Sequence, residues 1–172
     1  LTWFLEGIAA VFPEAWQDFI QFLPEAEQQD VLASYHQRLM SDDPDVHGPA
    51  ARAWARYEGS CSTLLPSSRG TSGLASGRAA LALARIESHY FVNKMFLPDA
   101  YFFENLYKIR HIPAVFVQGR YDMICPMVTA DALARAWPEA QYHIINDAGH
   151  SAMEPGVQSA LVAATEQFKA GG

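Results

Sequence analysis

The sequence predicts an α/β fold in which a mostly helical first part is followed by a short β-α-β-α segment. Between residues 2 and 91, apolar residues recur at the three- and four-residue spacing of amphipathic helices. Residues 114–117 and 141–145 are instead short runs of β-branched, aromatic and other apolar residues, which favours strands. A helical pattern over residues 128–137 separates the two runs, and this order is typical of a parallel βαβ unit.

Three helices are expected between residues 13 and 59. The first opens at Pro13 and ends at Pro24, because proline is favoured at the start of a helix and disfavoured inside it. The second begins at Pro24 and carries one apolar face. The Ser-Asp-Asp-Pro run at 41–44 ends that helix and caps the third, which continues past Trp54.

The remaining helices are separated by clear breaks. Residues 60–77 are rich in serine and glycine and predict a mobile loop between two helices. Helical spacing returns over 78–91, and Leu-Pro-Asp at 97–99 marks another break. A short aromatic helix over 102–106 and a final helix over 157–168 complete the expected elements.

A carboxylate and an imidazole follow the two predicted strands. Gly119 closes the first strand, so Asp122 is expected just beyond its carboxyl end, while Pro126 can open the next helix as its first residue. His150 comes shortly after the second strand. Open α/β sheets carry their functional groups at the carboxyl ends of their strands, so the two side chains could meet there.

Composition excludes several classes of function. The 172 residues carry a formal charge of −7 without a basic run, which argues against nucleic-acid binding. Two cysteines, Cys61 and Cys125, are too few for a disulfide framework and favour a reducing, cytoplasmic compartment. No apolar run of about 20 residues predicts a membrane span, and the histidines show no metal-binding spacing.

Several stretches resemble bacterial prolyl aminopeptidases, also called proline iminopeptidases, which are serine peptidases of the α/β-hydrolase fold. The stretches are 119–122, 136–140 and 148–155 in the second part and 54–59 and 84–91 in the first. The resemblance implies a helical cap domain over residues 1–110. It also implies that residues 111–172 form the carboxyl-terminal β-α-β-α portion of the hydrolase core.

The resemblance assigns a catalytic acid and a catalytic base. Asp122 matches the carboxylate of a Ser-His-Asp triad, and His150 matches the base. Asp147 is a competitor for the acid only in principle, because it lies three residues before His150 on the same loop. On spacing alone, Asp122 could equally close a turn and His150 could be an ordinary loop residue.

The resemblance also assigns residues that recognise the substrate, a peptide or prolyl amide. The family's cap places two glutamates around the amino-terminal ammonium group, and Glu58 and Glu87 match them. Tyr90 is one of the aromatic residues beside them and is expected to help bind the substrate. The alternative is that both glutamates are ordinary solvated helix residues, since charged side chains usually lie at the surface. His89 is expected to be structural.

The nucleophile is not recognisable in these 172 residues. No Gly-x-Ser-x-Gly motif occurs, and Cys61 lacks the strand-to-helix elbow that a nucleophile of this fold occupies. We therefore expect the chain to resemble the second half of a hydrolase. Its small sheet would be completed by a missing amino-terminal half or by a second copy of the chain, as in a homodimer. No cofactor is implied.

Two other functions remain open from the sequence. The same acid and base on the same fold also serve carboxylesterases, where the cap decides the substrate. Alternatively, the chain could be a catalytically incomplete fragment that self-associates through its exposed strands.

Overall fold

The computed structural model describes residues 2–66 and 77–170, and the chain divides into two compact units. The first unit comprises Leu1–Cys61 and Pro66–Pro98, and the second comprises Ser62–Leu65 and Asp99–Gly172. The short segment Ser62–Leu65 therefore joins the second unit, although the chain around it belongs to the first. Each unit is described below by itself.

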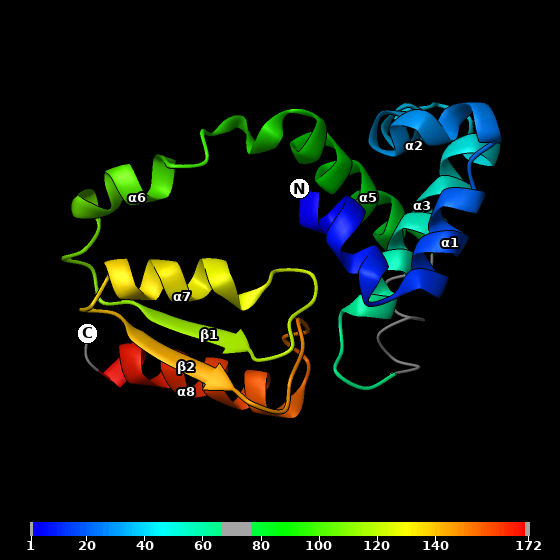
Figure 1. The fold of residues 1–172 in the computed structure, drawn as a ribbon. Helices are drawn as coiled ribbons and strands as arrows, with labels where there is room; N and C mark the ends of the chain where they lie inside the picture. Colours follow the sequence, from blue (N-terminus) through cyan, green and yellow to red (C-terminus); the bar gives the residue numbers. More distant parts are fainter. Residues whose placement is uncertain (1, 67–76, 171–172) are drawn as a thin grey trace. The chain divides into compact units, whose positions relative to one another are not determined.

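The described part of the first unit is built from helices (Figure 1). They are a π-helical turn η1 (Trp3–Gly7), a 3-10 turn η2 (Ile8–Ala10), α1 (Pro13–Gln21), a 3-10 helix η3 (Glu25–Asp30), α2 (Val31–Leu39), α3 (Pro44–Cys61), α5 (Gly77–Val92) and a short turn η4 (Lys94–Phe96).

Local sequence signals explain where these helices begin. Pro13 is the first residue of α1, as predicted, and its fixed φ suits that position. The Asp30 carboxylate caps α2 by accepting a hydrogen bond from the backbone N–H of Ala33 at 3.0 Å. The turn after Pro24 is a 3-10 helix rather than the start of one continuous α-helix, so the predicted second helix is divided at Asp30.

Buried aromatic rings form the core of the first unit. The Phe19 ring stacks on Tyr35 with 4.2 Å between centroids and on Tyr57 with 4.5 Å. Each tyrosine hydroxyl finds an acceptor, because Tyr35 donates to the Phe19 carbonyl at 2.7 Å and Tyr57 to the Phe4 carbonyl at 2.9 Å. Trp54 is fully buried beside them on α3. Such rings bury large apolar areas while their polar groups stay satisfied, so they fix how the helices pack.

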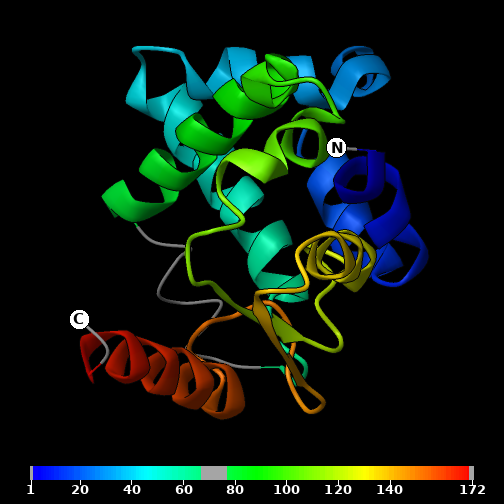
Figure 2. The ribbon, with the colours of Figure 1, turned by 90° about the vertical axis from the view of Figure 1, so that its left-hand side faces the viewer.

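The second unit contains a small parallel sheet between helices. Its strands are β1 (Val115–Gly119) and β2 (Gln141–Ile145), paired in register from Val115 with Gln141 to Gly119 with Ile145. Figures 1 and 2 show α7 (Met127–Ala136) on one face of the sheet and α8 (Pro155–Ala170) on the other. Before the sheet come a short helix α6 (Tyr101–Asn105) and a 3-10 turn η5 (Leu106–Lys108).

The predicted β-α-β-α order is confirmed, with shifts of a few residues at element ends. The first strand begins at Val115 rather than at Ala114, and it ends at Gly119, the residue expected to close it. Pro126 occupies the N-cap position of α7 instead of its first turn. In the predicted loop at 60–77, α3 continues to Cys61 and α5 begins at Gly77, while 67–76 lie outside the described residues. None of the described helices is long and apolar enough to span a membrane.

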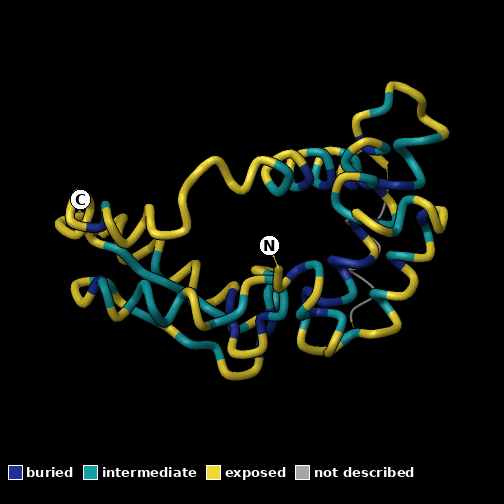
Figure 3. The backbone as a smooth tube through the Cα atoms, turned by 45° about the horizontal axis from the view of Figure 1, so that its top comes forward, coloured by how far each residue is buried: buried dark blue, intermediate teal, exposed yellow. Residues whose placement is uncertain are grey.

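Residues 93–104 form a continuous exposed stretch, drawn in yellow along the chain in Figure 3. Within it, Lys94, Met95 and Phe96 all have positive φ angles, of 49°, 58° and 60°. Side chains on L-residues disfavour this left-handed conformation because Cβ crowds the backbone. The turn after α5 is therefore held in a strained conformation.

Candidate active site

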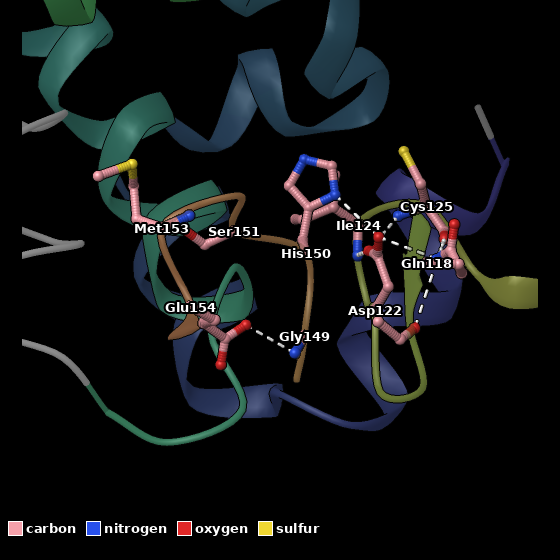
Figure 4. A network of polar contacts seen from close by, with 10 residues as sticks. Gln118, Asp122, Ile124, Cys125, Gly149, His150, Ser151, Met153 and Glu154 are labelled. Carbon is pink, nitrogen blue, oxygen red and sulfur yellow. Dashed lines mark hydrogen bonds and ion pairs between the residues drawn. The ribbon is translucent and has the colours of Figure 1, made fainter. Parts of the chain in front are cut away.

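Asp122 is buried in the turn that follows β1, where four groups converge on its carboxylate (Figure 4). Its Oδ1 accepts the backbone N–H groups of Ile124 at 3.0 Å and Cys125 at 2.7 Å. Its Oδ2 accepts a hydrogen bond from the side-chain amide of Gln118 at 3.1 Å, and the His150 ring hydrogen-bonds to the same oxygen. Donors from backbone and side chain fix the orientation of this carboxylate.

His150 lies on the loop after β2 with its ring turned toward Asp122. The distance from Nδ1 to Asp122 Oδ2 is 3.0 Å, and because an ionised carboxylate only accepts, Nδ1 carries the proton. The backbone N–H of His150 donates to the Ser62 carbonyl at 2.9 Å, and that of Ser151 donates to the same oxygen at 2.8 Å. Ser62 thus ties the histidine loop to the segment that follows α3.

Gly119, the last residue of β1, allows the end of β1 to touch the loop after β2. A Cβ on Gly119 would lie 1.8 Å from the Gly149 carbonyl oxygen, a distance that no side chain permits. The backbone N–H of Tyr121 also donates to the Ala148 carbonyl at 3.0 Å. Because the strands are parallel and in register, both loops leave the same end of the sheet, and this contact places Asp122 against His150.

Glu154 braces the histidine loop from its other side (Figure 4). Its Oε2 accepts the backbone N–H of Gly149 at 2.6 Å, and its Oε1 accepts that of Leu64 at 3.0 Å. One carboxylate therefore satisfies two backbone donors from segments that are far apart in the sequence.

Hydrogen bonding to the Asp122 carboxylate, followed by that to the neighbouring Cys125 side chain, raises the pKa of His150 to about 10. Partial burial of the ring opposes both effects, since it disfavours the charged form. The pair therefore stabilises the imidazolium that forms when Nε2 of His150 accepts a proton. This arrangement can hold a proton on Nδ1 and present Nε2 to a reacting group.

The predicted substrate glutamates lie in the first unit on two neighbouring helices. Glu58 is buried on α3, with 7% of its surface exposed. Glu87 lies on α5, and its Oε2 accepts the indole N–H of Trp54 at 2.7 Å. Glu58 is therefore not an ordinary solvated residue, contrary to the alternative considered from the sequence. Tyr90 is half exposed on α5, with its ring 5.4 Å from that of Phe96.

Other candidates from the sequence have different surroundings. Burial, followed by the nearby charges of Glu14 and Glu58, raises the pKa of the Cys61 thiol to about 12, so it stays protonated and poorly nucleophilic at neutral pH. Asp122, and not Asp147, is the carboxylate on His150. Within the ranges 2–66 and 77–170, no three His, Cys, Asp or Glu side chains gather as a metal site would need.

Sequence reasoning missed Gln118 and Glu154. Gln118 also donates to the Cys125 carbonyl at 3.0 Å and so braces the turn that holds Asp122. Its signal was a polar residue inside an otherwise apolar strand. Glu154 gave no comparable signal, because its two backbone partners are defined only by the fold.

The chain is similar to several known proteins. The sequence profile of the TAP-like protein family matches residues 102–171. A proline iminopeptidase of Arabidopsis thaliana is 47% identical over 99% of this chain and 46% of its own length. A probable proline iminopeptidase of Leptolyngbya boryana is 42% identical over 99% of this chain, and a proline iminopeptidase of Xanthomonas citri is 42% identical over 98%, each over 54% of its own length.

The chain spans about half the length of these curated relatives. The match to the TAP-like family agrees with the β-α-β-α order of the second unit, which is the carboxyl-terminal portion of an α/β-hydrolase fold. The resemblance predicted from the sequence is therefore confirmed: over nearly its whole length this chain is similar to proline iminopeptidases.

Proposed function

We propose that this chain supplies the cap, the acid and the base of a serine hydrolase of the prolyl aminopeptidase type, which releases an amino-terminal proline from peptides. The observation that carries the proposal is the 3.0 Å contact between Asp122 and His150 at the end of two parallel strands. The similarity to proline iminopeptidases over nearly the whole chain supports the substrate class.

In the proposed mechanism, the neutral form of His150, with its proton on Nδ1, accepts the proton of a serine hydroxyl at Nε2 as the serine oxygen attacks the prolyl carbonyl. The same proton then passes from His150 to the leaving amine, and an acyl-enzyme remains. Water attacks this ester in the second half of the reaction, again through His150, and free proline leaves. Asp122 stays ionised throughout and stabilises the imidazolium, a role that its donors from Gln118 and the backbone support.

The serine comes, in this proposal, from sequence beyond these 172 residues. None of them forms a Gly-x-Ser-x-Gly elbow, and the raised pKa of Cys61 makes a substitute thiol unsuitable. In the part of the chain that the structure describes, the sheet has two strands, and parallel sheets are normally larger and covered. A missing amino-terminal half or a second copy of this chain would add the strands that complete it.

Glu58, Glu87 and Tyr90 would bind the substrate's amino terminus. Two carboxylates suit the secondary ammonium of proline, and aromatic groups suit its apolar ring. The hydrogen bond from Trp54 occupies one oxygen of Glu87 and fixes that side chain, which supports a positioned rather than a mobile carboxylate. We assign the cap to residues 1–110 and the core portion to residues 111–172.

The two cysteines are both free, one buried and one exposed, which supports the further proposal of a reducing, cytoplasmic location. Fractionation of the source cells, followed by immunoblotting, would test it. Recovery of the protein outside the cytoplasmic fraction would contradict this part of the proposal.

A chimera tests the catalytic assignment. The part of a matched proline iminopeptidase that this chain does not cover is fused to residues 1–172, and hydrolysis of proline β-naphthylamide is measured. We expect the chimera to be active, and His150→Ala to lower kcat by about 10³-fold or more because the base is lost. The matched control is His111→Ala, an exposed histidine outside the site, which should leave the rate unchanged. An active His150→Ala chimera would overturn the assignment.

The substrate class is tested in the same chimera with Glu58→Gln and Glu87→Gln. Removing the negative charges should lower kcat/KM for the prolyl amide by at least about tenfold, since a hydrogen bond to a charged group is lost. Cleavage of p-nitrophenyl acetate, which has no ammonium group, should be retained. Equal losses on both substrates would argue against ammonium recognition by these residues.

The completing partner is tested with the 172-residue chain alone. Size exclusion with light scattering distinguishes a second copy from a separate half, because a copy gives a dimer whose fraction rises with concentration. A stable monomer that dimerises at no concentration but binds the uncovered part of a relative would identify the amino-terminal half as the partner.

A further inference from the structure

A cavity of about 430 Å³ opens between α1 and α3 in the first unit. Its apolar wall includes the half-buried Phe22, Pro49 and Ala53, while Phe19 and Tyr57 lie behind this wall and are nearly fully buried. Its polar wall includes Arg52 and Arg56 on α3. The volume lies within the range of small-molecule sites in proteins.

The two arginines are four residues apart and therefore lie on the same face of α3, one turn from each other. Neither forms an ion pair with any other residue in the ranges 2–66 and 77–170, and neither does Asp18, which lines the cavity from α1. With one carboxylate against two guanidinium groups, the cavity carries a net positive charge. This contrasts with the formal charge of −7 for the whole chain.

This cavity does not belong to the proposed substrate-binding face of α3. Successive helical residues are about 100° apart, so Arg56 and Glu58, two positions apart, point about 200° away from each other. Arg52, Arg56 and Ala53 thus share the face toward α1, and Glu58 lies on the opposite face.

We propose that the α1–α3 cavity binds a small organic anion, a carboxylate or a phosphate attached to a planar apolar group. Arg52 and Arg56 would bind the anionic group, because paired guanidinium groups match the oxygens of carboxylates and phosphates. Phe22 and Ala53 would contact the apolar part. An inorganic anion alone leaves the apolar wall unused, and an uncharged ring leaves both arginines unpaired.

The test uses the 172-residue chain labelled with ¹⁵N and titrated with benzoate, phenyl phosphate, acetate, inorganic phosphate and benzyl alcohol. Saturable shifts of the Arg52 and Arg56 side-chain Nε–Hε signals are expected with benzoate or phenyl phosphate. The stronger of these two probes identifies the anionic group as carboxylate or phosphate. Acetate, inorganic phosphate and benzyl alcohol should each bind at least about tenfold more weakly, since each lacks one half of the interaction.

Two variants separate the cavity from general electrostatics. The double substitution Arg52→Gln/Arg56→Gln should weaken binding of the aromatic anion by at least about tenfold. Arg78→Gln/Lys169→Gln removes the same charge from exposed positions outside the cavity and should leave the affinity unchanged. Ala53→Leu keeps both arginines but fills the cavity, so it should abolish the preference for aromatic over small anions.

Several results would overturn the site. They are the absence of saturable shifts at millimolar concentrations of either aromatic anion, equal binding of acetate and benzoate, and equal weakening by the two double variants. Circular dichroism of each variant confirms that it is folded, so loss of binding reports on the cavity. Because the readout needs no catalysis, it stands whether or not the proposed hydrolase activity is found.

Discussion

The indole N–H of Trp54, which is fully buried, donates to Glu87 Oε2 at 2.7 Å and links α3 to α5. A buried indole N–H needs an acceptor, because leaving a buried donor unpaired costs free energy. The same contact holds a carboxylate that we assign to substrate binding. Trp54 therefore joins the packing of the first unit to its proposed chemistry.

Replacing Glu87 tests this link. Glu87→Ala should lower the free energy of unfolding by about 1–3 kcal/mol, because the Trp54 donor is left buried without a partner. Glu87→Gln retains an acceptor oxygen and should cost much less. Urea unfolding followed by tryptophan fluorescence measures both. Equal effects from the two substitutions would mean that the hydrogen bond contributes little.

The pKa of His150 gives a second prediction. A ¹H–¹⁵N NMR titration of the ring should show a midpoint near pH 10, and Asp122→Asn should move the pKa down toward or below its ordinary value of 6.5. The exposed His111 provides an internal reference in the same spectra. A midpoint near 6.5 in the unsubstituted chain would contradict the charged pair.

The same shift predicts how stability depends on pH. Because the folded state binds the His150 proton more tightly than the unfolded state, the pair stabilises fully below about pH 6.5. Its contribution falls as pH rises and is lost as pH passes through about 10. The difference in unfolding free energy between the unsubstituted chain and Asp122→Asn should narrow over this window. A difference that is constant up to pH 10 would exclude this linkage.

The glycine contact between the two site loops gives a fourth prediction. Gly119→Ala places a Cβ against the Gly149 carbonyl, so the loops must separate and the Asp122–His150 contact should be lost. We expect destabilisation of about 3 kcal/mol or more, within the range of severe steric substitutions. Gly149→Ala is the graded control, because its Cβ would meet the Leu64 nitrogen at 3.0 Å and cost less. Loss of the Asp122–His150 contact should appear directly as a lower midpoint in the NMR titration of His150.

The strained turn after α5 predicts a stabilising substitution. Met95 has φ 58° and ψ 11°, a conformation that glycine adopts without the steric cost. Met95→Gly should therefore raise the free energy of unfolding by up to about 1 kcal/mol. Met40 is also partly exposed but has φ −84°, so Met40→Gly should be destabilising. Urea unfolding of both variants measures whether the free energy of unfolding rises for Met95→Gly and falls for Met40→Gly.

The sequence by itself determined the order of elements and the acid–base pair. Pro13 and the apolar spacing predicted α1, and the two apolar runs predicted β1 and β2, because such signals are local to a few residues. Asp122 and His150 could be selected because parallel strands bring their carboxyl ends together. The position of Asp147, three residues before His150 on the same loop, already disfavoured it as the acid. Spacing left open whether Asp122 merely closes a turn, and the family resemblance favoured its role as the acid.

Only the tertiary structure decided which groups hold that pair in place. The whole fold brings together the groups that hydrogen-bond around the pair. These contacts join Gln118 to Asp122, Ser62 to His150, and Glu154 to Gly149. The strained turn at Met95 and the α1–α3 cavity are likewise absent from any local pattern. Helix and strand signals arise from neighbouring residues, whereas hydrogen-bond partners and cavities arise from packing between distant ones, so the sequence alone does not reveal them.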